Sequence, residues 1–135
     1  ENCYNITKTH PIIVKEIEKK INSKYSYQTI RYINQHYTNF KFYWLMGADN
    51  LVNFHHWQNW RQFFKQISIV IFRRHGYNSA ALKSTASKTF VNYQIKSNKL
   101  NKIFFNSMPS WSFVQNREIR ISSTEIRRQR ELLRR

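Results

Sequence analysis

The sequence predicts an α/β domain in which a parallel β-sheet carries helices on both faces. Short apolar segments with the composition of strands alternate along the chain with segments whose apolar residues recur at helical spacing. This alternation of strand and helix is typical of a parallel sheet with crossover helices. The length of 135 residues fits one domain, and no internal repeat or low-complexity tract divides the chain.

The amino-terminal part contains one predicted strand and one predicted helix. The segment Ile12–Ile17, with the sequence IIVKEI, is rich in β-branched residues and follows Pro11, which favours an extended entry. Between Tyr27 and Tyr37 the apolar residues recur every three or four positions, the spacing of one helical face. We therefore expect a strand and then a helix before the centre of the chain.

Two further strands flank a helix in the middle of the sequence. Phe40–Met46 is nearly continuously apolar, as expected of a strand covered on both faces, and it ends at Gly47. Apolar residues then recur at helical spacing through Phe54–Ile67, which predicts a helix in the middle of that segment. The next strand is Ile67–Phe72, closed by Arg73–Gly76.

The last part of the chain is more polar. Ala80–Tyr93 is predicted as a helix and Ile103–Phe105 as a short strand, followed by a loop. Near the end, Ser122 and Glu125 stand in the S-x-x-E relation of a capping box, in which each side chain satisfies the free backbone N–H of the other residue. A helix is therefore predicted to start near Ser122 or Ser123.

The composition sets limits on the class of protein. Hydrophobic residues make up 41% and aromatic residues 16%, which excludes a disordered chain. Cys3 is the single cysteine, so no internal disulfide is possible. No apolar segment approaches the roughly 20 residues that cross a bilayer, and the first residues do not have the pattern of a signal peptide. We expect a cytoplasmic protein that has no membrane partner.

The chain is strongly basic. Its 23 Lys and Arg against 7 Asp and Glu give a formal net charge of +16. Such a field attracts polyanions, a group that includes nucleic acid, phosphorylated small molecules and acidic membrane surfaces. The abundance of Asn, Lys, Ile, Tyr and Phe is also the pattern of AT-rich codon usage, so the charge does not choose among these partners.

The turn Gly-Ala-Asp-Asn after the predicted strand Phe40–Met46 is a candidate nucleotide site. Gly47 has no Cβ, so a ligand can approach the backbone closely, and Asp49 can accept hydrogen bonds from ribose hydroxyls. The structural alternative is that Gly47 makes the turn and that Asp49 or Asn50 caps the next helix.

Trp57 is a candidate for stacking on a flat ring. It lies just beyond this turn, where an indole offered to a heteroaromatic ring such as pyridine contributes roughly 0.5–1.5 kcal/mol beyond burial. From the residues alone, a core role and a ligand role for Trp57 are equally open. For Trp60 and Phe64 the core role is favoured.

The stretch ISSTEIR is a candidate phosphate site. Ser122, Ser123 and Thr124 at a predicted helix N-terminus combine hydroxyls, free N–H groups and the positive end of the helix dipole. Arg127, one turn further, adds a charge-assisted contact. An ordinary capping box is the alternative interpretation.

These turns are expected to meet, because the carboxyl ends of parallel strands lie at one edge of a sheet. We therefore expect three turns to face a common crevice: Gly47–Asn50, Arg73–Gly76 and Ser122–Arg127. No metal site is predicted, because the adjacent His55 and His56 diverge on a helix and lack the i, i+4 spacing of a paired site.

Together these stretches resemble one family, the bacterial nicotinate-nucleotide adenylyltransferases of the nucleotidylyltransferase superfamily. The matching stretches, in the order of the family, are IIVKEIE, KYSYQTI, FYWLMGADNL, FHHWQNW, IVIFRRHGY and ISSTEIR. ISSTEIR alone also suits related pantetheine-phosphate or cytidylyl transferases, whereas GADNL followed by W-x-x-W looks like the nicotinate branch. The resemblance implies the nucleotidylyltransferase fold, here an incomplete Rossmann-like parallel sheet with helices on both faces.

The resemblance also implies an activity and a set of site residues. The family transfers AMP from ATP to nicotinate mononucleotide in the presence of Mg²⁺, forming deamido-NAD and pyrophosphate. By position, Trp57 resembles the residue that stacks on the pyridine ring, and Ser26 stands where the family usually has Thr beside the nicotinate carboxylate. The residues that resemble the ATP site are Gly47, Asp49, Arg73, Ser122, Ser123, Thr124 and Arg127.

The sequence departs from the family pattern in one respect. The family has a G-G-[ST]-F-D-P-x-H-x-G-H turn, whose two histidines bind ATP phosphates, and a P-P-H-K loop, and neither occurs in these residues. We therefore assign no catalytic residue and expect residues 1–135 to form a single partial domain with weak or no turnover. This pattern fits a fragment, a split gene product or a decayed copy.

Two other functions remain as alternatives. One is a non-enzymatic basic module that binds nucleic acid through lysines, arginines and exposed aromatic residues, although nucleic acid is the less expected partner. The other is a sister nucleotidylyltransferase that acts on a different phosphorylated acceptor. The oligomeric state is not fixed by the sequence.

Overall fold

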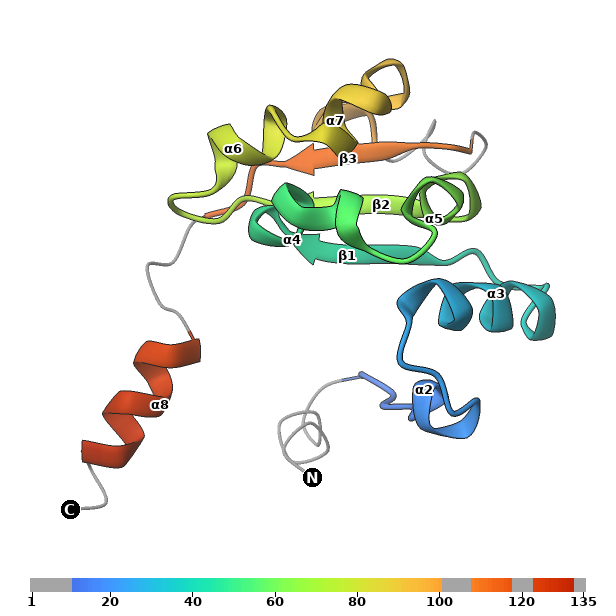
Figure 1. Ribbon diagram of the computed structural model, residues 1–135, viewed down its shortest axis with the longest axis horizontal. Coiled ribbons are helices and arrows are strands. Elements are labelled where there is room, and N and C mark those ends of the chain that lie inside the picture. The colour runs from blue at the N-terminus through green and yellow to red at the C-terminus, as the bar shows by residue number, and fades with distance from the viewer. Residues whose placement is uncertain (1–10, 101–107, 118–122, 133–135) are drawn as a thin grey trace.

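A computed structural model of the protein describes residues 11–100, 108–117 and 123–132. At its centre lies a three-stranded sheet formed by β1 (Tyr43–Gly47), β2 (Ser68–Phe72) and β3 (Trp111–Val114), side by side in that order (Figure 1). Both pairs of neighbouring strands are parallel. The predicted α/β class with a parallel sheet is confirmed.

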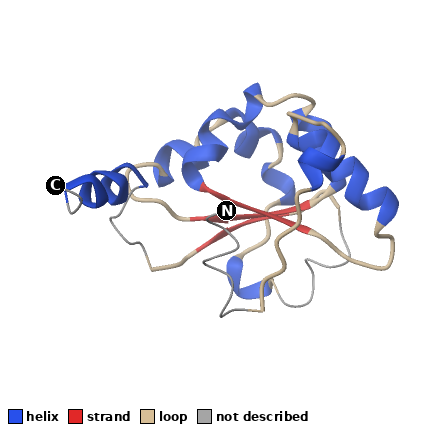
Figure 2. Ribbon diagram, turned by 90° about the horizontal axis from the view of Figure 1, so that it is seen from below, coloured by secondary structure: helices blue, strands red, loops and turns tan. Residues whose placement is uncertain are grey.

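Helices precede the sheet and connect its strands, and most of them lie on one side of the strands (Figure 2). In chain order they are α2 (Ile17–Lys20), α3 (Ser26–His36), α4 (Ala48–Asn53), the 3-10 helix η1 (Phe54–His56), α5 (Trp60–Gln66), α6 (Asn78–Leu82), α7 (Thr85–Thr89), the 3-10 helices η2 (Val91–Tyr93) and η3 (Ser97–Lys99), and α8 (Ser123–Leu132). None of the helices within the described ranges is long and apolar enough to cross a membrane.

The core lies between one face of the sheet and the helices of the crossovers. Register across the strands sets two rows of side chains on this face, Trp44, Ile69 and Trp111 in one row and Met46, Ile71 and Phe113 in the other. Fully buried side chains from the helices complete the core: Ile30, Leu51, Phe54, Phe63 and Phe64. Each such side chain contributes roughly 1.5–3 kcal/mol when it is removed from water.

The opposite face of the sheet is more open near β1. Leu45 is 61% exposed and Phe72 is 36% exposed. The expectation that the strand at Phe40–Met46 is covered on both faces is therefore wrong at Leu45. The alternate residues of the run, such as Trp44 and Met46, face the core.

The two outer strands of the sheet differ at their edges. Beside β3, the Ile95 N–H donates to the Trp111 carbonyl over 2.8 Å, and Gln94 forms a parallel bridge with Trp111. Within the described part of the chain, no strand pairs with the outer side of β1.

The strand predicted at Ile12–Ile17 is not present. Residues 12–16 have no regular structure, and α2 begins at Ile17. β-Branched composition stabilises a strand through neighbours on a sheet, and the described residues provide none here. Instead, α2 packs on α3, where a hydrogen bond to Tyr32 raises the pKa of Lys20.

The segment between β2 and β3 also differs from the prediction. The helix expected over Ala80–Tyr93 is divided into α6 and α7, because the Ser84 hydroxyl caps α7 by accepting the Ser87 N–H over 3.3 Å. The strand expected at Ile103–Phe105 lies outside the described residues. β3 forms where the sequence predicted a loop.

Candidate functional site

Trp57 stands in a turn and not inside one continuous helix. The Trp57 N–H donates to the Phe54 carbonyl over 3.0 Å, and the Trp60 N–H donates to the Trp57 carbonyl over 3.2 Å. Asn59 then takes a left-handed conformation, with φ of 53°, at the start of α5. These bonds fix the backbone of Trp57 between η1 and α5.

One side of the Trp57 indole packs against the aromatic core. Its ring centroid lies 4.7 Å from that of Phe54, 6.4 Å from that of Trp44 in an edge-to-face arrangement, and 6.1 Å from that of Phe63. Trp57 nevertheless remains partly exposed. Its packing is therefore compatible with both interpretations that the sequence left open, a core role and a ligand role, since the core orients a ring that remains partly exposed.

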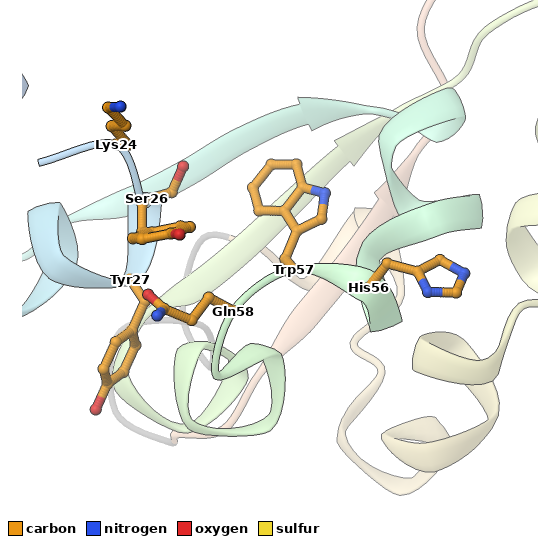
Figure 3. A pocket seen from close by; sticks show the side chains of 7 residues that line it. Lys24, Ser26, Tyr27, His56, Trp57 and Gln58 are labelled. Carbon is orange, nitrogen blue, oxygen red and sulfur yellow. The ribbon is translucent and has the colours of Figure 1, made fainter.

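A cavity of about 290 Å³ lies beside the exposed part of Trp57. It is lined by Lys24, Tyr25, Ser26, Tyr27, His56, Trp57 and Gln58. Lys24 and Ser26 lie across from the Trp57 ring, whereas the His56 imidazole points to the other side (Figure 3). Two of the predicted site residues, Ser26 and Trp57, thus meet at one cavity, whose volume is near the lower end for small-molecule sites.

Ser26 is the first residue of α3, where the leading backbone N–H groups lack partners inside the helix. The turn before it is held by Ser23, whose hydroxyl oxygen accepts the Tyr25 N–H over 3.1 Å. The same hydroxyl donates to the side-chain oxygen of Gln28. These bonds set the start of α3 beside the cavity.

A second group of predicted site residues lies at the carboxyl ends of β1 and β2. Asp49 Oδ2 is 2.9 Å from Arg74 Nη1, an ion pair between a side chain that is 27% exposed and one that is 45% exposed. Asp49 Oδ1 is buried and has no hydrogen-bond partner among the described residues. It lies over Gly47 in the space that a Cβ at that position would occupy.

Arg73 links the ends of β2 and β3. Its N–H donates to Asn116 Oδ1 over 2.8 Å, and the residue is half-buried. Together with the Asp49–Arg74 pair, this bond joins the ends of all three strands at one rim. Sequence reasoning did not find Arg74 or Asn116. Arg74 is the neighbour of the predicted site residue Arg73. Asn116 follows β3, so it is placed at this rim only when β3 is known to be a strand.

The predicted phosphate residues lie on and before α8. Thr124 and Arg127 are exposed on this helix, Ser123 is its first residue, and Ser122 lies outside the described residues. α8 stands on the side of the molecule where the strands end, but apart from the sheet (Figure 1). The structure thus does not bring Thr124 and Arg127 to the rim, and their phosphate role stays a prediction.

A resident metal site has no support in the described ranges. These contain no group of three or more His, Cys, Asp or Glu placed to hold an ion. His55 and His56 are neighbours with ring centroids 3.8 Å apart, and no further metal-binding side chain joins them.

Comparison with known families defines the class of protein. A family profile described as Cytidylyltransferase-like matches residues 6–129, which is most of the chain. The protein belongs to the cytidylyltransferase-like family.

Similar curated proteins share one name, "Probable nicotinate-nucleotide adenylyltransferase". The protein of that name from Ruegeria sp. strain TM1040 is 34% identical over 120 residues, which is 88% of this chain and 64% of the relative. One from Cereibacter sphaeroides is 30% identical, covering 87% of this chain and 63% of the relative. One from Rhizobium meliloti strain 1021 is 30% identical, covering 90% and 65%. The chain therefore spans slightly less than two thirds of the length of these relatives.

Proposed function

We propose that this protein takes part in adenylyl transfer from ATP to nicotinate mononucleotide, which gives deamido-NAD and pyrophosphate. The observation that carries the proposal is the meeting of Ser26 and Trp57, far apart in sequence, at one cavity. The name shared by relatives that align with most of the chain supports the same reaction.

In this proposal the cavity holds the pyridine ring. Trp57 offers its indole for stacking, and its contact with Phe54 orients the ring before the ligand arrives. Such preorganisation reduces the entropy lost on binding. The Ser26 hydroxyl would donate a hydrogen bond to the nicotinate carboxylate.

The rim at the strand ends would hold the adenosine part of ATP. Asp49 would accept hydrogen bonds from ribose hydroxyls, sharing its carboxylate with Arg74, and Gly47 and Arg73 would lie beside the nucleoside. Ser122, Ser123, Thr124 and Arg127 would bind the phosphates of ATP, which requires that α8 approach the rim.

The transfer needs no protein nucleophile. An oxygen of the mononucleotide phosphate attacks the α-phosphorus of ATP in line, a new P–O bond forms, and the bond to the pyrophosphate oxygen breaks. The part of this chain is to hold both substrates at the distance and angle that this attack requires. We assign it no catalytic residue.

The described residues do not fit a resident Mg²⁺ ion. Asp49 is the carboxylate at the rim, and it is already paired with Arg74. Mg²⁺ is usually held by one or two carboxylates together with substrate phosphates. It therefore enters the proposal as the counter-ion of ATP, as part of the substrate.

Titration of the protein with nicotinate mononucleotide by isothermal calorimetry tests the pyridine site. Trp57→Ala should raise Kd about fivefold or more, because stacking on an aromatic side chain contributes roughly 1–3 kcal/mol. Trp57→Phe, which keeps a flat ring, is the matched control and should lose much less. Circular dichroism melts of both variants check that the core contact with Phe54 is not the cause. An unchanged Kd for a folded Trp57→Ala protein would contradict the proposal.

The acceptor is tested by a second titration. Phosphopantetheine carries a phosphate but no aromatic ring, so it should bind more weakly than nicotinate mononucleotide and should not respond to Trp57→Ala. Tighter binding of phosphopantetheine would instead favour a sister transferase.

A further inference from the structure

We propose that Lys24 is a specificity-determining residue, which makes the cavity favour a pyridine that bears a carboxylate over the corresponding carboxamide. The inference rests on the proposed function, because it takes the cavity as the pyridine site. It concerns the preference between the acid and the amide, for which neither Trp57 nor Ser26 supplies a charge.

Lys24 lies on the same wall of the cavity as Ser26. It precedes the start of α3 by two residues, lines the cavity, and lies across from Trp57 (Figure 3). The residue is exposed, so its ammonium group is available to a ligand that enters from solvent.

No acidic side chain of the described residues neutralises the charge on Lys24. Among those residues, no Asp or Glu lines the cavity and Lys24 forms no ion pair. The contrast with the rim is direct, since there the guanidinium of Arg74 is paired with Asp49. The cavity therefore carries an unpaired positive charge at its edge.

Trp57 and the Ser26 side chain carry no charge that separates an acid from an amide. A stacked indole binds both pyridine rings alike, and the Ser26 hydroxyl can donate to a carboxylate oxygen or to an amide carbonyl. A lysine ammonium differs because it has three donors and no acceptor. It attracts the carboxylate by charge and offers nothing to the NH₂ group of the amide. Specificity is a difference between two affinities, and Lys24 acts on that difference.

The size of the effect follows from the exposure of Lys24. An ion pair made by a flexible lysine in contact with water is partly screened, so we expect roughly a two- to fivefold change in Kd. For the same reason the preference for the acid should shrink as the salt concentration rises.

The test compares nicotinate mononucleotide with nicotinamide mononucleotide, which differ in the acid and amide groups alone. Calorimetric titrations of the wild-type protein should give tighter binding of the acid. Lys24→Gln should weaken binding of the acid roughly two- to fivefold and leave binding of the amide nearly unchanged. Lys24→Arg should retain the preference. Lys83→Gln, at an exposed lysine that follows α6 and does not line the cavity, is the matched control and should change neither affinity.

The outcomes separate this inference from the proposed function. If Lys24→Gln leaves the acid affinity unchanged, or weakens both ligands equally, the role of Lys24 is refuted while the pyridine site stands. If neither mononucleotide binds the wild-type protein, or if Trp57→Ala affects neither of them, the pyridine site itself is refuted, and the inference with it.

Discussion

Gly47 shows how one residue determines the position of a charged neighbour. The carboxylate of Asp49 folds back over Gly47, and from there it reaches Arg74 at 2.9 Å. From the sequence, the missing Cβ of Gly47 predicted the close approach of a ligand to the backbone. In the structure, a side chain of the same turn already uses that space.

Gly47→Ala is therefore expected to turn the Asp49 carboxylate away and to break its ion pair with Arg74. Because the far end of a side chain moves and not the backbone, the free energy of unfolding should fall by about 0.2–1 kcal/mol, the contribution of a partly exposed pair. Urea denaturation measures this change. Arg74→Gln removes the same pair without touching Gly47 and should cost a similar amount. A much larger loss for Gly47→Ala would mean that the backbone itself is displaced.

Residue patterns predicted part of the candidate site. Trp57 and Ser26 were found because a strand-end turn, a following tryptophan and a short family pattern are local features of the sequence. Lys24, Arg74 and Asn116 were given no role, because their positions in the candidate site depend on which side chains face each other across the fold. No local spacing carries that information.

Short helices between the strands depend on side-chain caps. α7 has five residues, too few to be stable through helix propensity alone. Its cap Ser84 accepts the Ser87 N–H, and the Ser87 hydroxyl donates back to the Ser84 carbonyl over 3.0 Å. Ser84 is also buried, so its hydroxyl would not be replaced easily by water.

Ser84→Ala should lower the free energy of unfolding by about 0.5–2 kcal/mol, the usual cost of losing an N-cap. Chemical denaturation followed by tryptophan fluorescence measures this loss. Thr85→Ala, at the exposed next residue, is the control and should change stability much less. Equal losses for the two variants would show that the cap does not hold α7.

Elements were predictable where local pattern and tertiary burial agree. The strand expected at Ile67–Phe72 forms at Ser68–Phe72, since its apolar run is buried in the middle of the sheet. β3 was missed because four residues carry little pattern. It is held by tertiary contacts, such as the bond of 2.7 Å from Trp111 Nε1 to the Phe90 carbonyl. The opposite case is the segment 12–17, where local pattern and tertiary burial disagree. Its composition is typical of a strand, but it forms none because the described residues offer it no neighbouring strand.

Across the whole molecule, the net charge of +16 opposes the compact state through repulsion among lysines and arginines. Ion pairs between described residues include Lys19 with Glu16, at 3.5 Å, and Arg74 with Asp49. Screening by salt therefore removes more repulsion than attraction.

Raising NaCl from a few millimolar to about 0.15 M, where the Debye length is about 8 Å, should raise the melting temperature. A gain of about 1 kcal/mol corresponds to a rise of roughly 2–8 °C for domains of this size range. Calorimetric melts in NaCl and in Na₂SO₄ at equal ionic strength separate screening from binding of a particular anion. A rise in sulfate alone would indicate an anion site, and a fall in NaCl would contradict the repulsion argument.

The outer side of β1, which pairs with no strand in the described part of the chain, gives the same charge a second role. Among the described residues no strand pairs with this side of β1, where Leu45 is exposed and where the strand contains no lysine or proline to block the addition of another extended chain. We expect the mutual repulsion of two copies, each with a net charge of +16, to oppose their joining there. Salt that stabilises each molecule also weakens this barrier, so concentrated samples should precipitate under the conditions in which the single molecule is hardest to melt.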